Sequence, residues 1–89
     1  MSWDYRVEDT AARQLRALGP SAAAEILRFL DERIRGCSDP AKFGKPLRGA
    51  KKRFWRYRVR DWRILCRLEN GLLMVIVVAV GHRSTIYDE

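Results

Sequence analysis

The sequence predicts an α+β fold in which one mainly antiparallel sheet carries an antiparallel pair of helices. Three observations lead to this expectation. Residues 54–68 alternate between apolar and basic side chains, which is typical of half-buried strands. Residues 20–36 instead repeat apolar residues at helical spacing. The chain has 89 residues, 47% of them hydrophobic, so residues 1–89 are expected to form one domain around a small core.

A short strand is expected first, at residues 3–7, because Trp3, Tyr5 and Val7 alternate with Asp4 and Arg6. A helix should follow this strand, because the next apolar residues are spaced four and three positions apart. Asp9 or Thr10 can cap this helix by accepting its free amide hydrogens. Its apolar positions are Ala11, Leu15 and Leu18.

A second helix is expected after a Gly-Pro corner. Gly19 is suited to end the first helix, and Pro20 is suited to the first position of the next. Gly36 is the expected C-terminal stop. The apolar stripe of this helix comprises Ala23, Ile26, Leu27, Leu30 and Ile34.

Residues 37–52 have the composition of a basic loop, with proline or glycine at positions 40, 44, 46 and 49. Leu47 is expected to be buried. If Arg60 and Asp61 form a two-residue turn, the next two strands pair Val59 with Trp62 and Arg58 with Arg63.

The last strand of the meander is expected at residues 72–80, after a type I′ turn at Asn70-Gly71. Because this strand is apolar on both faces, it is expected to be central in the sheet. Gly81 should end it. The residues expected to face the helices are Leu73, Val75, Val77 and Ala79.

The basic residues of the hairpin are expected to share the face opposite the helices. Arg56, Arg58 and Arg60 alternate with apolar residues, and Arg63 lies opposite Arg58. Like charges in opposed positions destabilise a sheet, so an anion should compensate them. A merely solvated face would mix lysine with glutamate or threonine. We interpret this face as a phosphate-binding and catalytic surface. Trp55, Tyr57 and Trp62 lie on the other face and are expected to belong to the core.

The distribution of charge supports an anionic partner. The formal net charge is +7, and residues 42–67 hold eleven basic residues and a single acid, so they carry +10 and the remainder −3. A basic stripe of this kind is typical of nucleic-acid binding and suits an acidic protein equally well. The candidate phosphate-binding residues are Lys45, Arg48, Lys51, Lys52, Arg53 and Arg60.

Several classes of protein are not indicated by the sequence. No apolar run is long enough for a membrane helix, and the N-terminus has no hydrophobic signal core. Cys37 and Cys66 show no metal-binding spacing, and no cofactor motif is present. Cys66 alternates with core residues and is expected to be a buried thiol. We therefore expect a reduced, cytoplasmic protein with no metal or cofactor.

Four segments together resemble the RelE/ParE toxin superfamily of type II toxin–antitoxin systems, and in particular its RelE branch. They are Lys45-Pro46-Leu47-Arg48-Gly49, Trp55-Arg56-Tyr57-Arg58-Val59, Asp61-Trp62-Arg63-Ile64-Leu65 and Val80-Gly81-His82-Arg83-Ser84-Thr85-Ile86-Tyr87. The similarity spans nearly the whole chain in the same order.

This resemblance implies a ribosome-dependent messenger RNA endoribonuclease with the microbial-ribonuclease-like RelE fold. The positions that match the family's active site are Arg56, Arg58, Arg63, Arg83 and Tyr87. His82 is a further candidate, since strand parity directs it toward the arginines. The same parity directs Arg83 toward the helices unless the strand twists or bulges at Gly81.

The first two of these positions are often lysine in the family, and here both are arginine. Arginine is not a realistic general base, but it grips a phosphate bidentately and stabilises charge in a transition state. We therefore expect electrostatic stabilisation to dominate the attack of a ribose 2′-hydroxyl, which would leave a 2′,3′-cyclic phosphate. Tyr87 would orient or deprotonate that hydroxyl or stack on a base.

The resemblance also implies partners. These are messenger RNA on the ribosome and a cognate acidic antitoxin that folds on binding and covers the Tyr87 region. Operator DNA would be bound only through the antitoxin complex. Two alternatives to the nuclease remain open: a ParE-like inhibitor of DNA gyrase, and a non-enzymatic nucleic-acid-binding module.

Overall fold

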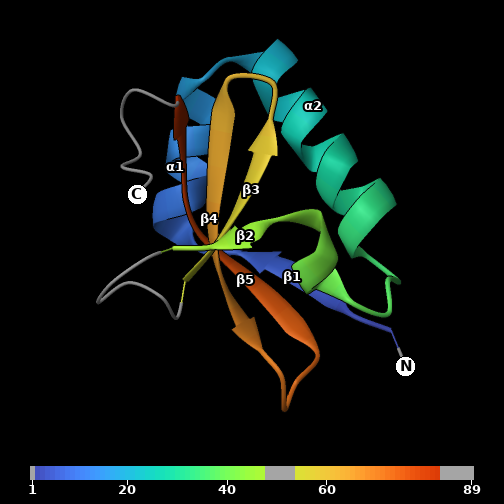
Figure 1. Ribbon diagram of the computed structural model, residues 1–89. Coiled ribbons are helices and arrows are strands. Elements are labelled where there is room, and N and C mark those ends of the chain that lie inside the picture. Colours follow the sequence, from blue (N-terminus) through green and yellow to red (C-terminus); the bar gives the residue numbers. More distant parts are fainter. Residues whose placement is uncertain (1, 48–53, 83–89) are drawn as a thin grey trace.

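Figure 1 shows a twisted sheet with two helices beside it, in a computed structural model that describes residues 2–47 and 54–82. The turn between β3 and β4 lies near the start of α2, and the turn between β4 and β5 lies at the opposite end. The elements in order are β1 (Asp4–Val7), α1 (Asp9–Ala17), α2 (Pro20–Phe29), the π-helical turn η1 (Leu30–Ile34), the 3-10 turn η2 (Pro40–Phe43), β2 (Lys45–Pro46), β3 (Phe54–Val59), β4 (Trp62–Glu69) and β5 (Met74–His82).

The five strands are ordered β1-β5-β4-β3-β2. β1 runs parallel to β5, and all other neighbours are antiparallel. The α+β class, the meander and the interior position of the last strand are therefore confirmed. The expectation of a plain loop at residues 37–52 is wrong, because η2 and the edge strand β2 form within it.

Both helices pack on one face of the sheet, around the Gly-Pro corner that the sequence predicted. Gly19 has φ +97°, and Pro20 is the first residue of α2. Gly36, with φ +84°, follows the last helical turn. None of the helices in the described residues is long and apolar enough to cross a membrane. The core cluster comprises Trp3, Ala11, Leu15, Ile26, Leu30, Ile34, Tyr57, Ile64, Cys66, Val75, Val77 and Val80.

Two details of the helices differ from the prediction. The residue before α1 is Glu8, and its side chain makes no capping hydrogen bond, so neither Asp9 nor Thr10 is the cap. Leu27 is 36% exposed. The buried stripe instead has one residue at every fourth position. The wider π-helical turn at η1 keeps its last residue, Ile34, on the buried side. The stripe is Ala22, Ile26, Leu30 and Ile34.

The first hairpin forms as predicted and the second does not. Arg58 pairs with Arg63 across the two-residue turn. Of the two turn residues only Arg60 has a positive φ, +53°, which is the pattern of a type II′ turn. In the second hairpin Glu69 pairs with Met74, so residues 70–73 form a four-residue turn. Its positive φ falls on Leu73 at +51°, which rules out the predicted Asn-Gly type I′ turn.

A β-bulge in β5 changes which of its residues face the core. Leu65 pairs with Ala79, but its neighbour Cys66 pairs with Val77, so Val78 is an extra residue on β5. A one-residue insertion moves every later side chain to the opposite face. The predicted inward position of Ala79 is therefore wrong, and Val80 is buried instead.

β5 also continues beyond its predicted end at residue 80. Gly81 pairs with Arg63 and His82 with Trp62, so Gly81 does not break β5. Trp62 packs against the helix-side core. Directly opposed residues share a face, so His82 lies on the helix side and not on the arginine face as strand parity predicted.

A side chain from α1 completes the hydrogen bonding of β5 past the bulge. β1 ends at Val7, opposite Val77, so within the described residues β5 has no neighbouring strand on that side beyond this point. There the Val80 N–H donates to Oε1 of Gln14 at 2.8 Å. Gln14 thereby satisfies a main-chain donor that the sheet leaves unpaired.

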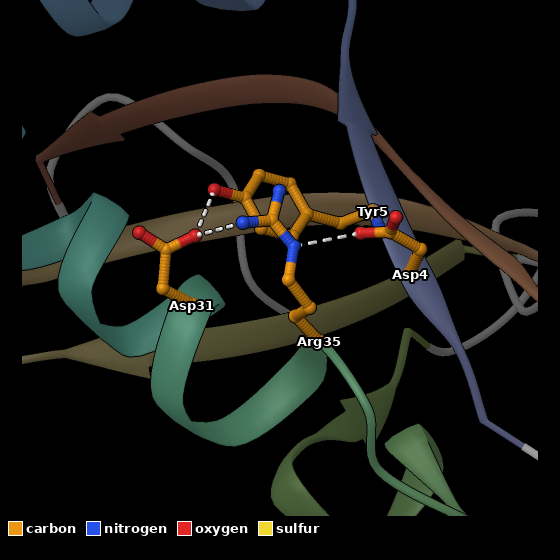
Figure 2. A network of polar contacts seen from close by, with 4 residues as sticks. All are labelled: Asp4, Tyr5, Asp31 and Arg35. Carbon is orange, nitrogen blue, oxygen red and sulfur yellow. Dashed lines mark hydrogen bonds and ion pairs between the residues drawn. The ribbon is translucent and has the colours of Figure 1, made fainter.

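A polar network ties β1 to the end of the second helical segment (Figure 2). Arg35 lies between Asp4 and Asp31, with N–O distances of 3.1 and 3.2 Å, and the Tyr5 hydroxyl donates to Asp31 at 2.6 Å. The Tyr5 amide and then Arg35 lower the pKa of Asp4. Burial and then Asp31 raise the pKa of Tyr5 to about 12. The network links the edge strand β1 to the helical segment that ends beside it.

Removing the Gln14 acceptor should destabilise the fold locally. We expect Gln14→Leu to lower the free energy of unfolding by about 1–3 kcal/mol, because a buried N–H then lacks a partner. Amide hydrogen exchange should speed up at Val80 more than elsewhere. Gln14→Glu, which keeps an acceptor oxygen, is the control. Unchanged protection of the Val80 amide in Gln14→Leu would contradict the assignment.

Candidate nucleic-acid interface

The sheet face opposite the helices carries two like-charged pairs on neighbouring rows. Lys45 of β2 is the register partner of Arg56, and Arg58 is the partner of Arg63. Tyr57 points into the core between the two arginines of β3, so Arg56 and Arg58 lie together on the opposite face. The predicted opposition of Arg58 and Arg63 is confirmed.

These cations differ in exposure. Arg58 and Lys45 are exposed, and Arg56 is half-buried. Arg63 is only 5% exposed. A charge removed from water interacts more strongly with a nearby anion than an exposed one does, because the surroundings screen it less. The row containing Arg58 and Arg63 thus combines an accessible guanidinium with a shielded one, and its third member is Gly81, which has no side chain.

Tyr57 anchors the turn η2 to β3 beneath this face. Its hydroxyl donates to the carbonyl oxygen of Pro40 at 2.8 Å, and its ring lies 5.5 Å from that of Phe29. Tyr57 is fully buried, and burial raises the pKa of its hydroxyl, so it remains a donor. Asp39 accepts a hydrogen bond from the Ala41 amide at 3.1 Å and caps the turn.

Gly44 allows the chain after η2 to lie directly against β3. A Cβ at this position would stand 2.3 Å from the carbonyl oxygen of Arg56 and 2.7 Å from the Tyr57 ring. Both distances are far inside van der Waals contact, so only glycine fits without a shift of the backbone. This close approach places the Lys42 and Lys45 side chains beside the two arginines of β3.

The result is an open cationic hollow of about 290 Å³ at the β2 edge of the sheet. No acidic residue is among its described lining residues. The Lys42 ammonium lies 5.4 Å from the centre of the Phe43 ring, within the range of a cation–π contact. The lining residues are Lys42, Phe43, Gly44, Lys45, Arg56 and Arg58.

Two other arginines are turned toward carboxylates. Arg60 donates to Glu25 of α2, so it lies in the turn on the helix side. The alternation predicted Arg60 on the same face as Arg56 and Arg58, and this prediction is wrong. Arg67 is 3.2 Å from Glu69 and 3.7 Å from Glu8. The structure thus brings together Lys45, Arg56, Arg58 and Arg63 and leaves Arg60 outside this group.

The remaining predicted site residues do not contribute to the described geometry. His82 is exposed on the helix-side row, as stated above. Within residues 2–47 and 54–82, no group of His, Cys, Asp or Glu side chains could hold a metal ion. The predicted residues that lie outside the described part of the chain are Arg48, Lys51, Lys52, Arg53, Arg83 and Tyr87.

Sequence reasoning missed the parts that build the hollow. The sequence predicted Lys42 only as a cation and Gly44 only as a glycine of the basic loop, Tyr57 only as a core residue, and nothing for Phe43. The available signal was Asp39-Pro40, a capping residue followed by proline, which is typical of the start of a helical turn. Nothing in the local sequence indicates that this turn docks onto the second hairpin strand.

Comparison with known proteins gives one consistent family. A family model described as the ParE toxin of the type II toxin–antitoxin system parDE matches residues 5–87. Toxin RelG of Mycobacterium tuberculosis is 30% identical over 87 residues, which are 98% of this chain and 98% of that protein. Toxin RelE of the same organism is 30% identical over 78 residues, which are 88% of this chain and 78% of that protein.

A solved structure agrees with the sequence comparisons. The toxin–antitoxin complex RelBE2 of Mycobacterium tuberculosis contains a chain that matches with a TM-score of 0.84 and 27% identity. The match covers 94% of each chain.

Replacing Gly44 tests the close approach that shapes the hollow. We expect Gly44→Ala to lower the free energy of unfolding by about 1–3 kcal/mol, because the added methyl group meets backbone that must move. The matched control is Gly71→Ala, whose Cβ would meet nothing within 4 Å. Urea unfolding of both variants measures the difference. Equal stability of the two would contradict the packing described here.

Proposed function

Since the chain belongs to the RelE/ParE superfamily of type II toxins, we propose that it is an endoribonuclease that cuts messenger RNA on the ribosome. The observation that carries this proposal is the facing pair Arg58 and Arg63, on the sheet face opposite α1 and α2 and beside a hollow with two lysines. A poison that only binds its target needs no such concentration of cations on one face. A nuclease needs it to hold and stabilise a phosphate.

We propose that Arg58 and Arg63 bind the scissile phosphate. Guanidinium groups donate paired hydrogen bonds to phosphate oxygens, and they stay charged throughout the reaction. The 2′-oxygen attacks phosphorus, the bond from phosphorus to the 5′-oxygen breaks, and negative charge accumulates on the phosphoryl oxygens between these events. The two arginines would stabilise that charge most strongly in the transition state.

The products of this reaction are a 2′,3′-cyclic phosphate and a 5′-hydroxyl end. The 2′-hydroxyl proton must leave, and the 5′-oxygen must gain one. Arginine is not a realistic general base, so electrostatic stabilisation by Arg58 and Arg63 is proposed as the main contribution. Arg83 and Tyr87, by the family resemblance, are the proposed further arginine and the residue that orients the 2′-hydroxyl. His82, on the opposite face, is given no step.

We further propose that the partner is a cognate antitoxin. The related RelBE2 chain forms a toxin–antitoxin complex. In this chain the acids of residues 42–67 are limited to Asp61, so an acidic segment would find little repulsion there. The proposed antitoxin covers the cationic face and the Tyr87 region, and binding of operator DNA is proposed only for the complex.

Inhibition of DNA gyrase is the second candidate function, since the matching family model carries the ParE name. A supercoiling assay with purified gyrase, run beside a translation extract, separates the two. The gyrase proposal predicts loss of supercoiling with intact messages, and the nuclease proposal predicts the reverse. A non-enzymatic nucleic-acid-binding module would leave growth normal after induction.

Substitution of the exposed arginine tests the nuclease proposal. We expect Arg58→Ala to lower messenger cleavage in a translation extract by about 10²-fold, the usual effect of removing a donor to a developing negative charge. Arg13→Ala, which removes an exposed charge from α1, should cleave like the parent.

Arg63→Lys complements this pair of variants, because it keeps the buried charge but not the bidentate geometry. It should fold and should also lose most of its activity. Cleavage at the parental rate by a folded Arg58→Ala protein would refute the assignment.

A further inference from the structure

The hollow beside the arginine face lies next to the row assigned above to the scissile phosphate, without coinciding with it. It is formed by η2, by β2 and by Arg56 and Arg58 of β3. Only Arg58 belongs to both places, and Arg63 does not line the hollow. Arg56 and Arg58 are two residues apart on one strand face, which separates their Cα atoms by roughly 6.8 Å. A ligand that extends along β3 would therefore pass from one place to the other.

The register supplies the main argument for a second anion. Lys45 faces Arg56 just as Arg58 faces Arg63, so two like-charged pairs follow each other along β3. Each pair places two cationic side chains next to each other on one sheet face, so two phosphate groups spaced along the strand can each contact one pair. A nucleic-acid backbone carries such groups at regular intervals, and a positively charged groove that tracks this backbone is the usual form of a single-strand binding site.

The hollow is also held in a fixed shape. Gly44 packs against the β3 backbone, and the Tyr57 hydroxyl holds the start of η2 through Pro40. Phe43 contributes its ring to the wall and holds the Lys42 ammonium over it. The two lysines thus stand on a packed turn, which lowers the ordering cost of binding an anion.

We infer that this hollow is a second phosphate subsite, in which Lys42, Lys45 and Arg56 bind the phosphodiester next to the scissile one in a single-stranded RNA. The inference rests on the proposed function, because it takes the scissile linkage to lie between Arg58 and Arg63. It adds residues of η2 and β2 to the RNA-binding surface, and it gives Lys42 a specific role. RNA suits the subsite better than an acidic protein segment does, because the two charged pairs repeat along one strand.

The test uses short RNA that cannot be cut. Fully 2′-O-methylated dinucleotides and trinucleotides without terminal phosphates carry one and two phosphodiesters and have no 2′-hydroxyl to attack. Their affinities are measured against salt concentration. For single strands the slope of log affinity against log salt is about −0.7 per phosphate bound, so the trinucleotide slope should be steeper by about 0.7.

Lys42→Ala and Lys45→Ala are the informative variants. Because each variant neutralises one phosphate less, the trinucleotide slope should fall by about 0.7, which is about fivefold weaker binding at 0.1 M salt. The dinucleotide keeps the other subsite and should bind almost as tightly as before. Lys42→Arg should restore the slope. Arg13→Ala removes the same charge from the exposed surface of α1 and should leave both slopes unchanged.

Four results would overturn the inference. The first is equal salt slopes for the two oligonucleotides on the parent protein. The second is an equal loss of affinity for both oligonucleotides in the lysine variants, and the third is the same loss in Arg13→Ala. The fourth is lysine variants that bind RNA like the parent but bind a Glu-rich peptide more weakly. The last would mark the hollow as a protein-binding surface. Because these RNAs are not cleaved, a failure of the nuclease proposal in translation extracts leaves this test intact.

Discussion

The docking of residues 40–45 onto β3 is the constraint on which the cationic face depends. It rests on a buried hydrogen bond from Tyr57 to Pro40 and on the contact of Gly44 with the β3 backbone. A tyrosine in the core that finds its polar partner in a surface turn fixes that turn to the sheet. Without this docking, Lys42 and Lys45 would lie in a loop that is not held at a fixed position relative to Arg56 and Arg58.

Three arginines outside the hollow are paired with acidic residues. Arg35 is paired with Asp4 and Asp31, Arg60 with Glu25, and Arg67 with Glu69. Exposed pairs of this kind contribute little to stability each. The acids of these pairs lie on the helices, the first strand and the far end of β4, and none of them is among the described residues that line the hollow. The positive potential is therefore concentrated on one face.

The parts of the fold that depend on local pattern could be predicted from the sequence. Alternation gave the two strands of the first hairpin, the Arg58–Arg63 pair and the buried Tyr57, and the Gly19-Pro20 corner gave the two helices. The bulge at Val78 could not be predicted, because a run of valines looks the same in either register. Its effects on Ala79, Val80 and His82 followed from that single insertion.

The candidate site was predicted in part. The arginines of β3 and β4 follow from alternation alone, whereas the hollow requires η2 to contact β3, which is distant in sequence. Local propensity carries no information on such a contact. Arg83 and Tyr87 came from the family resemblance and lie outside the described residues, so their roles stay predictions.

Mapping the RNA ends that form when the purified protein acts on a message held in ribosomes is the decisive experiment. We expect cuts that require the ribosome and that leave a 2′,3′-cyclic phosphate and a 5′-hydroxyl. Intact messages under conditions in which the same preparation arrests growth or inhibits gyrase would contradict the nuclease assignment.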